Sequence, residues 1–269
     1  MKNLVLRTVT GVAFVAVMVA GILYSPLTLW ALFMVITVLT TWEFTGLVNM
    51  QPGVQVNRIV TTATAAFLYL AVSGMQSGMH GSRALLVPWL LSIIYIMVEE
   101  LYLQRENPLN NWAYAMMAQL YIALPFSLLT LVSEQLYVFA IFLFLWCNDT
   151  GAYCTGSLIG RHKLFPRISP GKTWEGSIGG GVLAMACAAL VYFHAPSYAL
   201  TLPQWLGFAL IVVVSGTLGD LVESLFKRKL GVKDSGNILP GHGGMLDRFD
   251  SSLIAIPAVV AYLFILTLL

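Results

Sequence analysis

The sequence has little charge. Asp, Glu, Lys and Arg together make up 10% of its 269 residues, whereas 58% of the residues are hydrophobic. A soluble domain carries roughly 25% charged residues, so this composition excludes an ordinary soluble domain and predicts an integral membrane protein. The formal net charge is only +2, and we predict no nucleic-acid partner.

Cysteine is also scarce, and the chain has no pair of cysteines with metal-ligand spacing. Its three cysteines are Cys147, Cys154 and Cys187, each among apolar or small residues. This pattern argues against a disulfide framework and against a structural zinc site. We interpret the three as small packing residues.

Long apolar runs are plentiful, and turn-forming residues separate them. A helix needs about 20 apolar residues to cross the hydrocarbon core. The runs predict an all-α, polytopic membrane protein with nine spans near residues 8–24, 27–47, 58–77, 84–103, 112–132, 135–155, 176–194, 203–223 and 251–269. The first run follows Lys2 and Arg7 without a small-residue cleavage site, so we expect it to remain as a span.

The spans divide the chain into two regions. Residues 1–132 are expected to form five transmembrane helices, and residues 133–269 a catalytic transmembrane region. The second region contains the two long polar segments, 156–175 and 224–250, which we expect to border a polar cleft facing the cytoplasm.

The basic residues predict the orientation of the chain. With nine spans, every Lys and Arg of the 14 falls on one face except Arg83. Cytoplasmic loops carry such an excess of Lys and Arg. We therefore predict a multi-pass protein of the cell inner (cytoplasmic) membrane, whose N-terminus and polar segments face the cytoplasm.

Carboxylates gather around the 224–250 segment. Asp220 and Glu223 are three residues apart near the end of an apolar helix, so they share a face. Asp247 and Asp250 repeat this spacing at the start of the last span. Oxygen ligands of this kind suit Mg²⁺, and two pairs beside a basic segment favour a metal site over ordinary helix capping.

The same segment carries the groups that suit phosphate. Lys227, Arg228 and Lys233 can donate charge-assisted hydrogen bonds, although a basic patch on anionic lipid is the simpler interpretation of these residues alone. His242, Gly243 and Gly244 form a flexible turn whose backbone N–H groups can approach a ligand.

A second polar segment begins after Asp149, which we place at the end of a span. Its Ser169, Lys172 and Thr173 form a basic, hydroxyl-bearing loop that leads into a helix, an arrangement suited to phosphate contacts. A P-loop is excluded because Pro166 stands where its first glycine is required.

Three further acids lie in or near apolar spans. Glu43, Glu99 and Glu100 are functional candidates because ionisable groups are costly in a membrane. We interpret them as packing or interface residues.

Taken together, these residues resemble the signature of the phosphatidate cytidylyltransferases, or CDP-diacylglycerol synthases. The matching positions are Ser224, Lys227, Arg228, Lys233, Asp234, Pro240, His242, Gly243, Gly244, Asp247, Arg248 and Asp250. The upstream runs 149–153 and 169–176 resemble the family as well. Gly171 departs from it, since many members have lysine there.

The resemblance implies that CTP and phosphatidic acid are converted to CDP-diacylglycerol and pyrophosphate, with Mg²⁺ and a neighbouring monovalent ion such as K⁺. It also implies a homodimer. The resemblance and the carboxylate pattern together imply catalytic roles for Asp220, Asp247, Lys172 and Arg248. They imply that a metal ion is bound by Asp220, Glu223, Asp247 and Asp250. They imply that the substrates are bound by Asp149, Ser169, Lys172, Thr173, Ser224, Lys227, Arg228, Lys233, His242, Gly243 and Gly244.

Other functions remain open at this point. A CTP-dependent polyprenol-type kinase would release CDP, and a related synthase would act on ether-linked archaeal lipids. A transporter is disfavoured because transporters place polar groups near the bilayer midplane in symmetric halves, whereas here the charges gather at one face.

Overall fold

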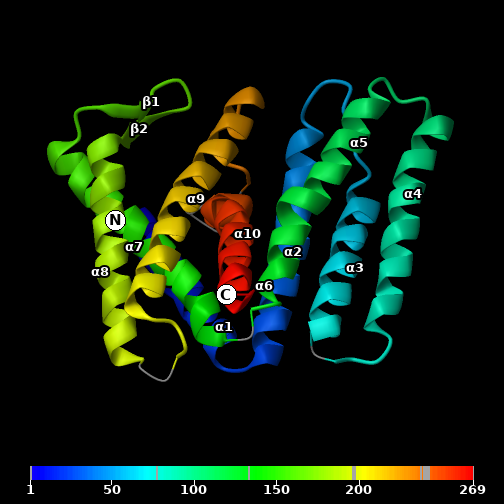
Figure 1. Ribbon diagram of the computed structural model, residues 1–269. Helices are drawn as coiled ribbons and strands as arrows, with labels where there is room; N and C mark the ends of the chain where they lie inside the picture. The colour runs from blue at the N-terminus through cyan, green and yellow to red at the C-terminus, as the bar shows by residue number, and fades with distance from the viewer. Residues whose placement is uncertain are drawn as a thin grey trace. The chain divides into compact units, whose positions relative to one another are not determined.

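The computed structural model describes residues 2–76, 78–132, 134–195, 198–236, 238 and 243–268. Within this part of the chain, nine long helices and one short hairpin are formed (Figure 1). The helices are α1 (Lys2–Leu23), α2 (Pro26–Val48), α3 (Arg58–Gln76), η1 (Ser82–Leu85) leading into α4 (Leu86–Leu103), the continuous run of α5 (Pro108–Met117), η2 (Ala118–Ala123) and α6 (Leu124–Leu129), α7 (Gln135–Ile159), α8 (Trp174–His194), α9 (Leu202–Lys229) and α10 (Leu246–Leu268).

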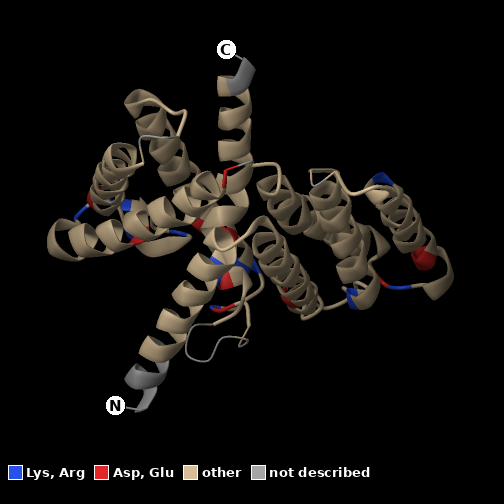
Figure 2. Cartoon of the chain, turned by 90° about the horizontal axis from the view of Figure 1, so that it is seen from below, with Lys and Arg blue, Asp and Glu red and all other residues tan. Residues whose placement is uncertain are grey.

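The helices have the length and composition of membrane spans. Eight of those described are long and apolar enough to cross a bilayer, and α1 carries a shorter apolar stretch, Thr8–Leu23. Figure 2 shows that Lys, Arg, Asp and Glu occupy only a small part of the helices. The predicted all-α, multi-pass membrane fold is therefore confirmed.

The chain forms two compact units. The first comprises Met1–Gln135 together with Lys229–Phe249, and the second comprises Leu136–Arg228 together with Asp250–Leu269. The first unit thus takes up a segment that lies far along the sequence from its five N-terminal helices.

Aromatic packing explains how the first unit holds that distant segment. Phe249 is 1% exposed, and its ring lies 5.9 Å from that of Phe14, 6.5 Å from that of Phe33 and 5.6 Å from that of Phe126. Edge-to-face aromatic pairs add about 0.5–1.5 kcal/mol each to the free energy of burial. The start of α10 is thereby anchored among α1, α2 and α6.

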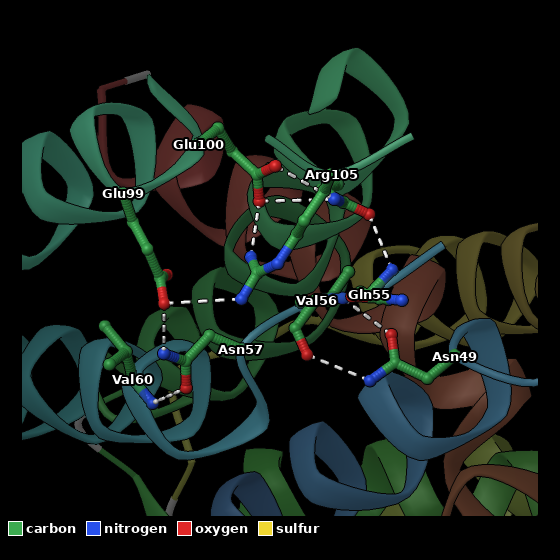
Figure 3. A network of polar contacts seen from close by, with 9 residues as sticks. Asn49, Gln55, Val56, Asn57, Val60, Glu99, Glu100 and Arg105 are labelled. Carbon is green, nitrogen blue, oxygen red and sulfur yellow. Dashed lines mark hydrogen bonds and ion pairs between the residues drawn. The ribbon is translucent and has the colours of Figure 1, made fainter. Parts of the chain in front are cut away.

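A polar network ties together the loops of the first unit (Figure 3). Arg105 donates to Glu100 at 2.5 Å and to Glu99 at 3.4 Å. Asn111 also donates to Glu100, and Asn57 donates to Glu99 at 2.9 Å. Each acid therefore has donors that compensate its removal from water, and the interpretation of both as packing residues agrees with this geometry.

In the second unit, glycines let α7 and α8 approach closely. A Cβ added to Gly151 would lie 2.9 Å from Gly180 Cα and 3.0 Å from Gly179 O. A Cβ added to Gly176 would lie 2.8 Å from Ala152 O. Small residues allow such backbone contact between membrane helices, and the contact supports α7 to its end at Ile159.

A hairpin stands where the sequence analysis expected a loop. β1 (Lys163–Phe165) pairs antiparallel with β2 (Ser169–Thr173), with Lys163 opposite Thr173. The Ile168 N–H donates to Phe165 O at 3.2 Å, which closes a four-residue turn with Pro166 second. Proline favours that position because its φ is already fixed. A turn signal was thus present in the sequence but was not interpreted as a hairpin.

The hairpin runs directly into α8, and Thr173 joins the two. Its Oγ1 accepts the Gly176 N–H at 3.1 Å, so Thr173 is the N-cap of α8. The residue is 5% exposed. A capping hydroxyl satisfies one of the N–H groups that the first turn of a helix leaves unpaired.

The α7–α8 contact predicts that one glycine substitution destabilises the protein and that a second one does so much less. Gly151→Ala should lower the free energy of unfolding by about 1–3 kcal/mol, because its methyl group would meet backbone atoms that cannot move independently. Gly181→Ala is the matched control, since its Cβ would meet only Val213 at 3.5 Å. Thermal unfolding in detergent measures both, and equal melting temperatures for the two variants would contradict the packing described.

The N-cap predicts that Thr173→Val destabilises the protein by about 1 kcal/mol, because valine keeps the shape but cannot accept the Gly176 N–H. Thr173→Ser retains the acceptor and should unfold close to the wild type. The same unfolding assay tests this order, and a valine variant as stable as the serine variant would show that the cap contributes nothing.

Candidate functional site

The polar end of α9 lies in the second unit and is helical. The sequence analysis ended this span near residue 223, whereas α9 continues to Lys229. Asp220, Glu223, Ser224 and Lys227 therefore sit three or four residues apart on one helix, a spacing that places side chains on one face.

An ion pair joins α9 to the hairpin. Lys172 on β2 lies 2.6 Å from Asp220 Oδ2, and Ser224 Oγ donates to Asp220 Oδ1 at 3.1 Å. The two charged side chains are 26% and 30% exposed, so both remain accessible to a ligand. The structure thus brings together three predicted site residues from segments some fifty residues apart in the sequence.

A second ion pair lies within α9. Lys227 Nζ is 2.5 Å from Glu223 Oε2, and the Glu223 side chain is fully buried. A buried carboxylate is costly unless it is paired. This ion pair fixes the position of the Lys227 ammonium group. The metal-ligand role of Glu223 stays a prediction.

Asp149 and Asp250 are two further acids of the second unit. The charges of Asp220, Lys227 and Asp149 all act on Asp250, which is partly buried in α10. Asp149 was expected at the end of a span, and this was wrong, because α7 runs ten residues further, to Ile159. It is exposed on the helix.

The carboxylates have the chemistry that a divalent cation requires. Asp149, Asp220 and Asp250 offer hard oxygen atoms, and their like charges act against one another unless a cation compensates them. Within the described residues, no three Asp, Glu, His or Cys side chains form a ready-made metal site. The magnesium ligands therefore stay a prediction.

Asp247 lies in the first unit, in the first turn of α10. Its Oδ2 accepts the N–H groups of Ser235 and Gly244, each at 2.9 Å. The macrodipole of a helix favours negative charge at this end. Two donors on one oxygen fix the direction of the carboxylate.

Glu43 is the residue whose importance the sequence analysis missed. It lies on α2, is 7% exposed, and accepts hydrogen bonds from the same segment that holds Asp247. Its signal in the sequence was an ionisable group within an apolar span. Its partners lie about two hundred residues away, so the contact itself left no local pattern.

The other predicted site residues lie on the hairpin, at or just beyond the end of α9 and near the start of α10. Ser169 lies on β2, and Arg228, Lys233 and Arg248 are exposed. Gly243 adopts a φ of 83°, in the left-handed region that favours glycine. His242 lies outside the described residues.

Comparison with known proteins places the chain in a family. The model of the Cytidylyltransferase family matches residues 5–266. A protein named phosphatidate cytidylyltransferase from Staphylococcus aureus (strain COL) is 47% identical over 148 residues, which cover 54% of this chain and 56% of the relative. Another with that name, from Staphylococcus haemolyticus (strain JCSC1435), is 50% identical over 123 residues, covering 45% and 46%.

The chain spans about half the length of the curated relatives that it matches. The family model, by contrast, extends over all nine helices. This chain belongs to the cytidylyltransferase family.

Proposed function

We propose that the protein transfers the cytidylyl group of CTP to phosphatidic acid, giving CDP-diacylglycerol and pyrophosphate. The observation that carries this proposal is the accessible Lys172–Asp220 pair, which lies with Asp149, Asp250 and Lys227 in a unit of mainly apolar helices. Family membership and the names of the relatives support it.

The proposed reaction needs charge compensation more than it needs a protein nucleophile. A phosphate oxygen of phosphatidic acid attacks the α-phosphorus of CTP, and the bond from that phosphorus to the bridging oxygen of pyrophosphate breaks. Both reactants are anions, so their approach is opposed by repulsion. Positioning them and surrounding the transferred group with cations lowers that barrier.

The cationic side chains divide this work in the proposal. Lys172 and Lys227 each have a carboxylate partner that fixes the ammonium group within reach of the other charges. We propose that they and Arg248 contact the triphosphate and the lipid phosphate, as Arg and Lys commonly do. Glu223 then serves to orient Lys227.

A bound Mg²⁺ would polarise phosphoryl oxygens and offset their charge. We retain Asp220, Asp247 and Asp250 as its proposed ligands, because the motif supplies them and carboxylate oxygen suits the ion. The monovalent ion, the homodimer and the cytoplasmic orientation also remain proposals. The one-sided distribution of Lys and Arg supports the orientation.

The activity itself can be tested by following both products. Purified protein in detergent, given CTP, phosphatidic acid and Mg²⁺, should release pyrophosphate and labelled liponucleotide in equal amounts. Omission of phosphatidic acid or addition of EDTA should abolish both. Release of CDP without pyrophosphate would instead establish a lipid kinase.

Replacement of two of the proposed ligands, one at a time, should separate activity from folding. Asp220→Asn and Asp247→Asn should each lower turnover roughly 100-fold or more, since each removes a carboxylate proposed to hold the Mg²⁺ that offsets the charge of the phosphoryl groups. Glu106→Gln, which neutralises an exposed acid in the first unit, is the control and should retain activity. Thermal unfolding would confirm that all variants fold, and normal turnover by Asp247→Asn would place the metal elsewhere.

A further inference from the structure

Glu43 is a buried acid that lies more than a hundred residues before the family signature. It sits on α2, among the apolar residues of a span, and is 7% exposed. A carboxylate in such surroundings costs several kcal/mol unless donors replace its water. The identity of those donors therefore indicates what Glu43 does.

The donors come from the start of α10 and the segment before it. Oε2 accepts the Met245 N–H at 2.8 Å, and Oε1 accepts the Leu246 N–H at 3.0 Å as well as the hydroxyl of Ser235. The first N–H groups of a helix have no partner within it and carry partial positive charge. Glu43 thus acts as an N-terminal cap supplied by a different helix.

The same contacts extend to Asp247. Ser235, whose hydroxyl bonds to Glu43, donates its N–H to Asp247 Oδ2, and the Asp247 N–H points back to Ser235 Oγ at 3.3 Å. Gly244, which precedes the two N–H groups that Glu43 binds, donates to the same Oδ2. Glu43 and Asp247 therefore bind the same short piece of backbone.

Glycines make room for both carboxylates. A Cβ on Gly236 would lie 2.7 Å from Glu43 Oε2, and a Cβ on Gly244 would collide with Glu43 Oε1 and Ser235 Oγ. At Gly243, a Cβ would lie 2.6 Å from Asp247 Oδ2. These glycines are required by the carboxylates that they surround, whether or not the turn also contacts a phosphate.

We propose that Glu43 is a positioning residue for Asp247: through Ser235 and the first turn of α10, it sets the direction in which the Asp247 carboxylate points. The inference rests on the proposed function, in which Asp247 holds the divalent ion. Residues that orient a metal ligand in this way commonly change metal affinity or activity by about 10- to 100-fold when replaced.

The segment has a second, apolar anchor, which makes the proposal testable. Phe249 packs among Phe14, Phe33 and Phe126, and none of these ring contacts involves Glu43. We therefore expect Glu43→Gln to fold, because glutamine keeps the shape of the side chain and one acceptor oxygen. The variant loses one hydrogen bond, because its NH₂ group faces a backbone N–H that Glu43 accepts.

The test compares Glu43→Gln with Glu100→Gln, in intact protein in detergent. Glu100 is also a buried acid of the first unit, but within the described residues its hydrogen bonds go to Arg105 and Asn111. Figure 3 shows its contact with Arg105. Glu43→Gln should weaken Mn²⁺ binding, measured by electron paramagnetic resonance, by about 10-fold or more. It should raise the Mg²⁺ concentration for half-maximal turnover by a similar factor, with the KM for CTP little changed.

The control decides between positioning and general destabilisation. Glu100→Gln should leave Mn²⁺ affinity and the Mg²⁺ requirement as in the wild type. Equal losses in both variants, or wild-type Mn²⁺ affinity in folded Glu43→Gln, would overturn the proposal. If Glu43→Gln does not fold, Ser235→Ala removes the hydroxyl link alone and should weaken Mn²⁺ binding in the same direction, and unchanged binding would again overturn it.

The Mn²⁺ measurement also separates the two proposals. A wild-type protein without cytidylyltransferase activity would refute the proposed function. A difference in Mn²⁺ binding between Glu43→Gln and Glu100→Gln would still support the link from Glu43 to Asp247.

Discussion

The cost of placing a carboxylate in apolar surroundings governs where charge occurs in this protein. Among the described residues, the buried acids Glu43, Glu100 and Glu223 each have nearby donors or a cation: the start of α10, Arg105 and Lys227, respectively. A pair of this kind adds little net stability, but breaking it is expensive. The buried acids therefore act chiefly by fixing the loops and helix ends that carry their donors and cations.

The second constraint is the close approach of other atoms to the backbone at glycines. It serves both helix–helix contact and the placement of carboxylates. Between α7 and α8, Gly151 and Gly180 permit a helix contact that no larger residue allows. Around Glu43 and Asp247, Gly236 and Gly244 leave space for carboxylate oxygens. In both cases the missing side chain matters because a neighbouring atom occupies its place, and chain flexibility is not the main reason for glycine.

The number and order of the helices could be predicted from apolar runs, because length and hydrophobicity alone decide whether a segment can span a bilayer. Their ends could not. The apolar pattern of α9 stops near Glu223, yet the helix continues to Lys229 because the ion pair between Glu223 and Lys227 supports it. The ion pair between Lys172 and Asp220 and the hydrogen bond from Met245 to Glu43 are tertiary contacts, and such contacts leave no periodic pattern in the sequence.

The contact between α2 and the start of α10 means that the signature-bearing half of the sequence is not self-contained. Residues 229–249 belong structurally with the first 135 residues, although they carry part of the motif by which the family is recognised. When the halves of two homologues are exchanged, position 43 and the backbone that it binds come from different parents. We therefore expect such a chimera to fold only where one parent supplies an acceptor on the second helix and the other supplies small residues around it.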